Sequence, residues 1–377
     1  MSAQLDVLIS GTTATSYSIR IGTDLLKELL TMLPKNKRMA VIITDHIVKK
    51  HYAISIERSL KQAGYKTLLL SCPAGEQSKN GRTKSRLEEK MLAQGCDRDT
   101  LILALGGGVV GDLAGFIAAT FMRGIAYIQI PTTLLAMLDS SVGGKTGIDT
   151  PQGKNLIGAF WQPSAVIADV NCLRTLSKKQ MINGLIEALK MFLISDKDSL
   201  TFLEENLAVI LSDIPNSSSR TRDDVLINLI HRAVKMKADI VAHDEREQHQ
   251  RAILNFGHTI GHAIEHLTQY QCLHGYAVAL GILVEAKIAQ LMGHLHVTHY
   301  LYIKTLLQKL DITLHELKCF DVDALIKSTQ LDKKKRDGLV RYVLLTGLGT
   351  VYEHDGQFVH PVDDVLVKRA FFEIIGA

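Results

Sequence analysis

The first half of the chain alternates short apolar runs with amphipathic stretches. The apolar runs are bounded by Gly, Asp or Pro, and unbroken runs of this kind are typical of strands buried on both faces of a parallel sheet. The amphipathic stretch 47–63 has helical spacing and ends at Gly64, a residue suited to a helix C-terminus. We expect strands at 39–44, 67–71, 100–105, 126–130 and 165–169.

After about residue 170 the pattern becomes helical, and the length of 377 residues is enough for two domains with separate cores. The polar stretch 214–224 is expected to be a loop, and 339–346 is the one late strand that we expect. Helices are expected at 177–194, 200–211, 223–242, 259–267, 277–292 and 299–310. The sequence therefore predicts an α/β nucleotide-binding domain with a parallel sheet over 1–170. A mainly α-helical domain over 171–377 follows, with the active site in the cleft between the two.

The composition excludes several classes of protein. Lys and Arg number 43 against 39 Asp and Glu, which is not the basic excess of a protein that binds nucleic acid. Five scattered Cys form no CxxC pair, which argues against disulfides or a Cys-type zinc site and favours a reducing compartment. The first residues do not resemble a secretory signal, and the apolar stretch 101–122 is interrupted by Asp112 and glycines. We expect a soluble, cytoplasmic protein with no membrane or nucleic-acid partner.

A glycine-rich turn follows one predicted strand and precedes a helix. Gly106, Gly108 and Gly111 match GxGxxG, in which residues without Cβ let the backbone approach a pyrophosphate at a helix N-terminus. The acidic residue expected about 20 positions onward is missing, since Pro131 stands there, although Asp45 could contact a ribose instead. The motif leaves nucleotide binding and an ordinary tight turn equally open.

A second glycine-rich segment, 139–147, resembles a phosphate cradle and ends in GGKTG. A Walker A motif would need Gly where Asp139 stands, so we reject a P-loop. Lys145, Lys154 and Asn155 fall close together in this part of the chain. They are solvated loop residues or part of a small-molecule phosphate or cofactor site, and the glycines favour the second interpretation.

Two histidines, His258 and His262, lie four residues apart on one helix face, a spacing that lets two imidazoles reach one divalent metal. Thr259 stands where a metalloprotease would carry its general-base Glu, so that chemistry is unsupported. His274 and Glu187 are candidates for further ligands. With 15 His in the chain, a structural role for the pair stays open, as does the choice between ligand and acid/base for His262.

Taken together and in order, several blocks resemble the 3-dehydroquinate synthase family of the sugar phosphate cyclases. The blocks are GGGVVGDLAGFIAATFMRG (106–124), IPTTLLAMLDSSVGGKTGID (130–149), GKNLIGAFWQP (153–163), GLIEALK (184–190), LNFGHTIGHAIEH (254–266), HGYAVALG (274–281) and DKK (332–334). The resemblance implies a lyase of the shikimate pathway, which serves aromatic amino acid biosynthesis. It would cyclise 3-deoxy-D-arabino-heptulosonate 7-phosphate, a phosphorylated sugar acid, to 3-dehydroquinate with loss of phosphate. Tightly held NAD, a divalent metal (zinc first, cobalt as the alternative) and a homodimer are also implied.

The resemblance also implies residue roles. The metal ligands would be Glu187, His258 and His274, which leaves His262 near the phosphate and the proton transfers. The NAD site would be lined by Asp45, Glu76, Lys79, Gly107, Gly108, Val109, Asp112, Thr132, Thr133, Lys154, Thr175 and Asn183. The other catalytic residues would be Asp139, Lys145, Asn155, Lys190, Lys237, Arg251 and Asn255. Substrate would also meet Lys333 or Lys334, and Arg123 would reach its phosphate across a dimer interface.

Lysines and Arg251 match a substrate that bears one phosphate and one carboxylate. Another sugar phosphate cyclase and a metal-dependent polyol or glycerol dehydrogenase are the alternatives, and the lysine-rich substrate side argues against an uncharged polyol. A non-catalytic nucleotide-binding protein would be expected to lack a metal ligand, and all three candidates are present. The chain departs from the family pattern at Met137, Leu138, Trp161 and Tyr276. Of these, Tyr276 is close in sequence to His274, so it could affect how this proposed ligand is oriented toward the metal.

Overall fold

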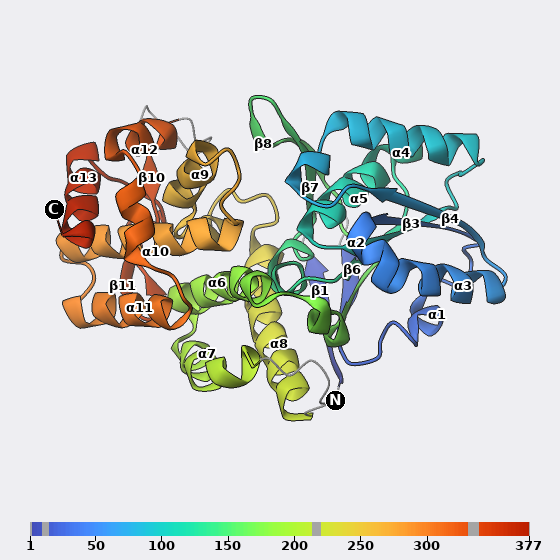
Figure 1. Cartoon of the computed structure of the whole chain (residues 1–377), viewed down its shortest axis with the longest axis horizontal. Helices are drawn as coiled ribbons and strands as arrows, with labels where there is room; N and C mark the ends of the chain where they lie inside the picture. The colour runs from blue at the N-terminus through green and yellow to red at the C-terminus, as the bar shows by residue number, and fades with distance from the viewer. Residues whose placement is uncertain (1, 10–14, 213–219, 331–338, 377) are drawn as a thin grey trace. The chain divides into compact units, whose positions relative to one another are not determined.

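The computed structural model describes residues 2–9, 15–212, 220–330 and 339–376 (Figure 1). The chain forms two compact units, each made of two segments. The first unit comprises Met1–Met181 and Ser212–Ala242, and the second comprises Ile182–Leu211 and His243–Ala377. Helix α8 (Arg220–His243) thus packs with the first unit, although it follows the start of the second in sequence. The division into domains at about residue 170 stays a prediction.

The first unit is built on a seven-stranded sheet with the order β1-β2-β9-β6-β5-β3-β4. All neighbouring strands are parallel except the antiparallel pair β1 and β2. The predicted parallel sheet is therefore confirmed, and all five predicted strands are present within one or two residues. The strands are β1 (Ser2–Ile9), β2 (Thr15–Gly22), β3 (Met39–Asp45), β4 (Lys66–Cys72), β5 (Leu101–Gly106), β6 (Tyr127–Pro131) and β9 (Ala165–Asp169).

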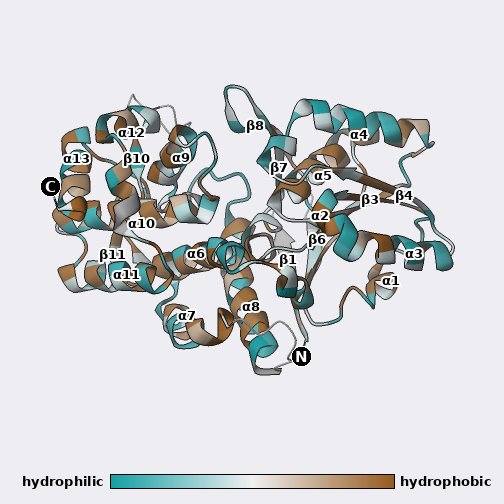
Figure 2. Ribbon diagram, in the orientation of Figure 1, coloured by the Kyte–Doolittle hydropathy of each residue, from teal (hydrophilic) through white to brown (hydrophobic). Residues whose placement is uncertain are grey.

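Helices cover both faces of this sheet. Val41 and Ile43 of β3 face the core shared with α4 (Gly81–Ala93) and α5 (Gly108–Thr120). Ala40 and Ile42 face the opposite core, which includes α1 (Leu29–Met32) and α3 (Ile54–Gln62). The connections that follow β3 and β5 thus lie on opposite faces, and in parallel α/β sheets the crevice at such a point is where ligands bind, beyond the carboxyl ends of the strands. Figure 2 shows hydrophobic residues concentrated in the strands and in α5, whereas the visible side of α4 is hydrophilic.

Short elements complete the first unit. The helix expected over 47–63 is present, but it begins as α2 (His46–Val48) and passes through a π-helical turn, η1 (Lys49–Ala53), before α3. Gly64, which follows it, has a left-handed φ of 85°, as its position predicts. The end of the second glycine-rich segment, 139–147, lies in a separate antiparallel hairpin formed by β7 (Lys145–Thr150) and β8 (Gly153–Phe160). The remaining elements are η2 (Glu76–Ser78), η3 (Phe121–Arg123), η4 (Ala136–Ser140) and η5 (Val170–Thr175).

The second unit is mainly helical, as expected, and its centre is α10, which is buried along most of its length. Most of α6 belongs to this unit, together with two small antiparallel ladders, β10 with β13 and β11 with β12. Its elements are α6 (Lys178–Ser195), α7 (Lys197–Ile210), η6 (Gln250–Asn255), α9 (His258–Leu267), α10 (His274–Leu291), α11 (Val297–Lys309), η7 (Leu314–Cys319), α12 (Val322–Thr329), β10 (Arg341–Tyr342), β11 (Leu345–Gly347), β12 (Thr350–Val351), β13 (His360–Pro361) and α13 (Asp364–Ile375).

Two predictions for this half of the chain are wrong. The late strand expected at 339–346 is two short strands, β10 and β11, which pair with two further strands that the sequence pattern did not indicate. The loop expected at 214–224 lies partly outside the described residues, and its last part, 220–224, begins α8. The polar residues Arg222, Asp223 and Asp224 lie in the first turns of this helix and are half-buried, and Asp223 pairs with Arg174 at 2.8 Å.

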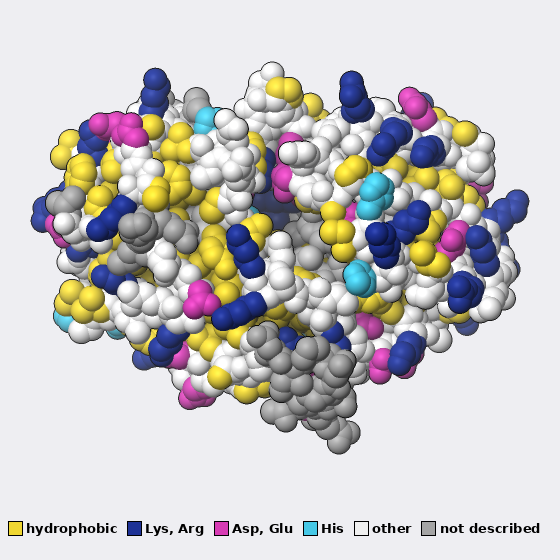
Figure 3. Space-filling view, in the orientation of Figure 1, with side chains coloured by type: hydrophobic (Ala, Val, Ile, Leu, Met, Phe, Trp, Pro, Cys, Tyr) yellow, Lys and Arg dark blue, Asp and Glu magenta, His cyan; other side chains and the backbone are white. Residues whose placement is uncertain are grey.

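No helix in the described part of the chain combines the length and apolar character needed to cross a membrane. On the face shown in Figure 3, Lys and Arg side chains are distributed among Asp, Glu and hydrophobic side chains.

Candidate active site

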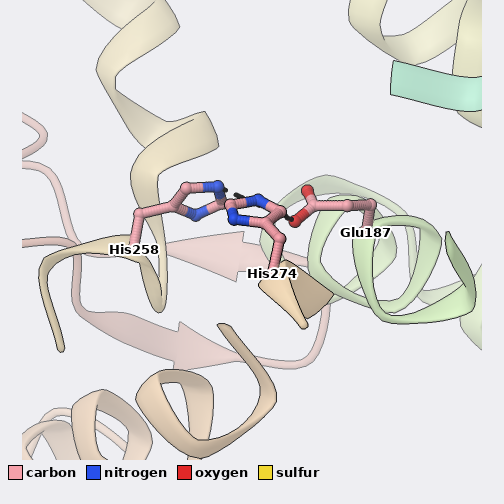
Figure 4. Close-up of side chains that lie close together, drawn as sticks. All are labelled: Glu187, His258 and His274. Carbon is pink, nitrogen blue, oxygen red and sulfur yellow. Dashed lines mark ion pairs between the residues drawn. The ribbon is translucent and has the colours of Figure 1, made fainter. Parts of the chain in front are cut away.

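The second unit brings together Glu187, His258 and His274. Glu187 lies within α6, whereas His258 and His274 are the first residues of α9 and α10. One ligand atom of each lies within 4.8 Å of the others. The Nε2 atoms of His258 and His274 are 3.7 and 3.3 Å from Oε1 of Glu187 (Figure 4). The three residues that the family resemblance implies as metal ligands therefore form one cluster.

The cluster has the donor set and orientation that a divalent metal needs. Two imidazoles and one carboxylate with a position left for water or substrate are a common catalytic zinc set. The Nδ1 atom of His258 is 3.2 Å from the carbonyl oxygen of Phe256, and Nδ1 of His274 is 3.2 Å from Oε2 of Glu265. With each Nδ1 donating to an oxygen, the Nε2 lone pairs are turned toward the shared point. The residues present thus fit a metal ion.

The pKa values of two residues in the cluster, Glu187 and His274, are displaced from their usual ranges. Glu187 is fully buried, and its Oε2 is 2.6 Å from Nζ of Lys190, one turn along α6. Burial alone would raise the pKa of Glu187, but Lys190 and His274 outweigh it and hold that pKa well below its usual range. Burial would lower the pKa of His274, but Glu265 and Glu187 outweigh it and raise that pKa to about 10. The carboxylates of Glu187 and Glu265 therefore favour a positive charge at His274, either a proton or a bound cation that replaces it.

His262 lies beside the cluster and outside it. Its ring centroid is 5.4 Å from that of His258 and 6.2 Å from that of His274, and it is not part of the metal-binding group. It lies one turn after His258 on α9, so both imidazoles are on the same side of the helix. This placement agrees with a residue that acts next to a metal.

The basic residue Arg251 lies in the first turn of η6, and one carboxylate holds the backbone that leads into this turn. Asp244 accepts hydrogen bonds from the backbone N–H groups of Gln248, His249 and Arg251, at 2.8, 2.8 and 3.0 Å. Arg251 is 2% exposed, and its guanidinium donates to the carbonyl of Glu245. Its orientation is therefore fixed from both its backbone and its side chain.

Two asparagines of the predicted site also lie in the second unit. The Nδ2 group of Asn255 donates to Oε1 of Glu247. Asn183 accepts a 2.7 Å hydrogen bond from the backbone N–H of Gly275, the residue that follows His274. Asn183, which the resemblance implies for the NAD site, thus fixes the first turn of α10 as well.

In the first unit, the glycine turn lies between β5 and α5, as predicted. Gly107 is the N-terminal cap residue of α5, a helix of 13 residues, and makes no side-chain capping bond. A Cβ on Gly107 would lie 3.1 Å from Cγ2 of Thr133, and one on Gly108 would lie 3.1 Å from Oγ of Ser140. The narrow turn and the N–H groups at the start of α5, which include that of Val109, fit a pyrophosphate.

Other predicted NAD residues lie along the same edge of the sheet. Thr132 follows β6 and donates its backbone N–H to the carbonyl of Gly106 at 2.9 Å. Asp45 ends β3, beside β5, and its Oδ1 accepts from the backbone N–H groups of Ile47 and Val48. Thr175, which ends η5, shares a 2.9 Å hydrogen bond with the hydroxyl of Tyr52.

A buried lysine joins the cofactor and substrate residues of this unit. Lys79 is 4% exposed, and its Nζ is 2.5 Å from Oδ2 of Asp112, 2.6 Å from Oδ1 of Asn155 and 3.9 Å from Oε1 of Glu76. Burial opposes the charge on Lys79, but Asp112 and Glu76 outweigh it and raise its pKa. Lys154 lies at the edge of this group, with Nζ 3.7 Å from Oε1 of Glu76.

Asp149 belongs to the same group and was not predicted. Its Oδ1 accepts the backbone N–H of Asn155 at 2.9 Å, and its own N–H donates to the carbonyl of Lys79 at 2.8 Å. Asn155 has a left-handed φ of 54°, a conformation that non-glycine residues adopt at a cost. Burial raises the pKa of Asp149 to about 6, and the Glu76 carboxylate adds to that rise. The place of Asp149 beside Asn155 depends on the β7–β8 hairpin, which the sequence pattern did not show.

The remaining predicted residues are distributed over the first unit and beyond. Lys237 of α8 contacts Asp139 of η4, whereas Lys145 is exposed at the start of β7. Arg123 is exposed and has a left-handed φ of 66°. Lys333 and Lys334 lie outside the described residues.

The fold is that of a solved structure of 2-deoxy-scyllo-inosose synthase in complex with carbaglucose-6-phosphate, NAD+ and Co2+. The two proteins are 27% identical, and the match covers 98% of this chain and 100% of that one with a TM-score of 0.88. A parallel sheet with a glycine turn, joined to a helical unit with a Glu–His–His cluster, therefore defines a protein of the sugar phosphate cyclase class.

Sequence comparison narrows this class to one family. Family models described as 3-dehydroquinate synthase N-terminal and C-terminal match residues 69–183 and 184–335. The 3-dehydroquinate synthase of Caldanaerobacter subterraneus subsp. tengcongensis is 44% identical over 82% of this chain and 85% of its own length. That of Thermodesulfovibrio yellowstonii is 41% identical over 89% and 92%. The chain belongs to the 3-dehydroquinate synthase family.

Proposed function

We propose that this chain converts 3-deoxy-D-arabino-heptulosonate 7-phosphate to 3-dehydroquinate and phosphate, in the shikimate pathway of the cytoplasm. The observation that carries the proposal is the cluster of Glu187, His258 and His274 beside Lys190, in a member of this family. NAD and zinc are the proposed cofactors, with cobalt as the alternative metal. The related 2-deoxy-scyllo-inosose synthase, crystallised with NAD+ and Co2+, supports NAD together with a divalent metal.

Glu187, His258 and His274 would hold the metal, and the N-terminal turn of α5 would hold the NAD pyrophosphate. When bound, the metal supplies a Lewis acid, and NAD supplies an acceptor and donor of hydride that ends each turnover unchanged. Asp45 would contact a ribose of NAD, and Lys79 would hold Asp112 in place. The remaining residues proposed for this site are Glu76, Gly107, Gly108, Val109, Thr132, Thr133, Lys154, Thr175 and Asn183.

The substrate carries a phosphate and a carboxylate, and the proposed substrate residues are mainly cationic. Arg251 presents a planar guanidinium that suits a carboxylate or phosphate, and buried Lys190 and Lys237 supply fixed positive charge. His262 would exchange protons next to the metal, because its ring adjoins two proposed ligands. Asp139, Lys145, Asn155, Asn255, Arg123 and one of Lys333 and Lys334 complete the proposed set.

We also propose a homodimer, with Arg123 reaching the phosphate site of the partner subunit. Strand β8 pairs with β7 alone among the described strands, and it exposes Leu156, Ile157 and Phe160. An apolar strand edge of this kind favours pairing with another chain, and a second copy is the occupant that we propose.

The test is phosphate release from 3-deoxy-D-arabino-heptulosonate 7-phosphate with catalytic amounts of NAD, before and after metal is removed with a chelator. Absorbance of NADH is followed in the same cuvette. We expect phosphate to be released while NADH does not accumulate. We expect phosphate release to stop when the metal is removed. Steady formation of NADH from glycerol or another polyol, without phosphate release, would instead identify a polyol dehydrogenase.

A further inference from the structure

Helices α9 and α10 carry the two histidines of the cluster at their first residues, and they pack against each other unusually closely. A Cβ on Gly261 would lie 3.2 Å from Cα of Val278, and one on Gly281 would overlap the carbonyl oxygen of Gly257. Small residues on both helices therefore allow backbone to approach backbone. Each helix also carries one buried glutamate that contacts the beginning of the other.

Glu265 of α9 reaches His274 at the start of α10. It lies seven residues after His258, two turns along the helix, and so shares the helix face that carries His258. Glu265 is 2% exposed, and its Oε2 is 3.2 Å from Nδ1 of His274. That nitrogen lies across the imidazole ring from Nε2, which faces Glu187. Glu265 therefore lies behind the histidine and holds its Nδ1, where it orients the ring without joining the metal-binding group.

Glu285 of α10 reaches the start of α9 in the opposite direction. It is fully buried, and its Oε2 accepts a 2.9 Å hydrogen bond from the backbone N–H of Gly257, the residue before His258. Gly257 has a left-handed φ of 78°, and a Cβ there would lie 2.7 Å from Cγ1 of Ile282. The carboxylate thus fixes the backbone from which His258 projects, at a position where the neighbouring helix leaves room for glycine only.

We propose that Glu265 and Glu285 are reciprocal positioning residues for the metal: each of the two helices holds the histidine of the other. Neither glutamate was among the residues that the resemblance implied, and the proposal rests on the assignment of His258 and His274 as metal ligands. Burying a carboxylate costs desolvation free energy. These two carboxylates offset that cost in function, because they fix the orientation of the two histidines. Loss of one such contact typically weakens metal binding by about 10- to 100-fold.

The experiment measures the zinc dissociation constant of the full-length protein by competition with a chromophoric chelator, for Glu265→Gln, Glu265→Ala and Glu285→Gln. We expect zinc to bind about 10- to 100-fold more weakly to Glu265→Ala. Glu265→Gln should show a smaller loss, because its amide oxygen can still accept from Nδ1 while the charge is gone. Glu285→Gln should likewise show the smaller loss, through His258, because its amide oxygen can still accept from the N–H of Gly257. Glu373→Gln is the matched control, an acidic residue of the same unit that pairs with Lys287 and Arg369 on the surface.

Two further readouts separate positioning from a structural role. The visible absorption of bound Co2+ reports the ligand geometry, and we expect its bands to shift or weaken in the Glu265 and Glu285 variants but not in Glu373→Gln. Thermal unfolding of the metal-free proteins shows whether each variant folds. Folded variants with unchanged zinc affinity and Co2+ spectra would overturn the proposal. Wild-type protein that binds no metal would instead overturn the proposed function.

Discussion

The ammonium group of Lys237 donates to both the side chain and the backbone of Asp139, with Nζ 2.7 Å from Oδ1 and 2.6 Å from the carbonyl oxygen. The two residues are 98 positions apart in sequence and meet within the first unit. Both side chains are largely buried, at 8% and 21% exposure. The contact ties α8 to the η4 turn and fixes two residues of the proposed substrate site against each other.

We expect Lys237→Met to lower both activity and stability, because it removes a cation from the substrate site and takes away the contact between Lys237 and the Asp139 carboxylate. Hydrogen bonds to charged groups contribute about 1.5–3 kcal/mol, so kcat/KM should fall by roughly 10- to 100-fold and the free energy of unfolding by a similar energy. Steady-state kinetics and urea denaturation measure the two effects. Lys61→Met, which breaks a pair with Glu57 in which the lysine side chain is 59% exposed, should change neither. Unchanged kinetics in Lys237→Met would remove Lys237 from the site.

We expect His258→Ala to abolish metal binding and turnover while the fold is retained, because the cluster keeps only Glu187 and His274. Metal content after dialysis, phosphate release and circular dichroism are the measurements. The control is His354→Ala, a surface histidine whose side chain is 68% exposed. A His258→Ala protein with full activity and little bound metal would contradict the assignment.

The close packing of α9 against α10 gives a third prediction. Gly281→Ala should place a methyl group against the carbonyl of Gly257 and push the two helices apart. We expect the free energy of unfolding to fall by about 1–3 kcal/mol and metal affinity to fall with it, because each helix carries one proposed ligand. Gly347→Ala is the control, since its nearest neighbour would be Oγ1 of Thr350 at 3.9 Å. Equal stability of the two variants in urea would show that the helices can adjust.

The parts of the fold that the sequence predicted are those with strong local patterns. Strands β3, β5, β6 and β9 are almost wholly buried, so their sequences are unbroken apolar runs. Strands β1 and β2 were missed because they form an antiparallel pair at the sheet edge, in which residues such as Asp6 and Arg20 stay exposed. The placement of α8 with the first unit depends on tertiary packing, which no local pattern records.

The site divides in the same way. The HxxxH pair and the glycine turn are local patterns. His274 and Glu187 were candidate ligands from the sequence, and the family resemblance made them the proposed ligands together with His258. Glu265 and Asp149 were missed, because each acts on a residue that only the tertiary fold places beside it: His274 for the first, Asn155 for the second. A buried acidic residue within a proposed motif is the signal that would have found Glu265, which belongs to the block 254–266.

The raised pKa of Asp149 makes stability depend on pH. Burial, with the nearby Glu76 carboxylate, raises this pKa from an ordinary 3.8 to about 6, so the native state binds the proton more tightly than the unfolded chain does. The contribution of protonated Asp149 to the free energy of unfolding is complete below about pH 4 and is lost as the pH rises through about 6. Asp149→Asn keeps an acceptor for the N–H of Asn155 and carries no charge.

We therefore expect Asp149→Asn to gain stability relative to wild type as the pH rises from about 4 to 6, with no further change above about pH 7. Urea denaturation at closely spaced pH values measures the difference. Asp355→Asn, at a surface position with an 88% exposed side chain, should show no such trend. A difference that is flat across this window would mean that Asp149 is not the group that titrates.

The exposed edge of β8 gives the last prediction. Ile157 is 50% exposed and Phe160 is 42% exposed, and in the proposed homodimer the partner subunit covers both. Ile157→Lys and Phe160→Lys should shift the protein from dimer to monomer in sedimentation velocity, because a lysine at the interface would have to be desolvated. Activity should fall in parallel, since Arg123 would no longer reach the neighbouring phosphate site. Leu92→Lys, at a 56% exposed position on α4, is the control and should leave both properties unchanged. If wild-type protein sediments as a fully active monomer, Arg123 has no role across an interface, and the apolar edge of β8 then needs another explanation.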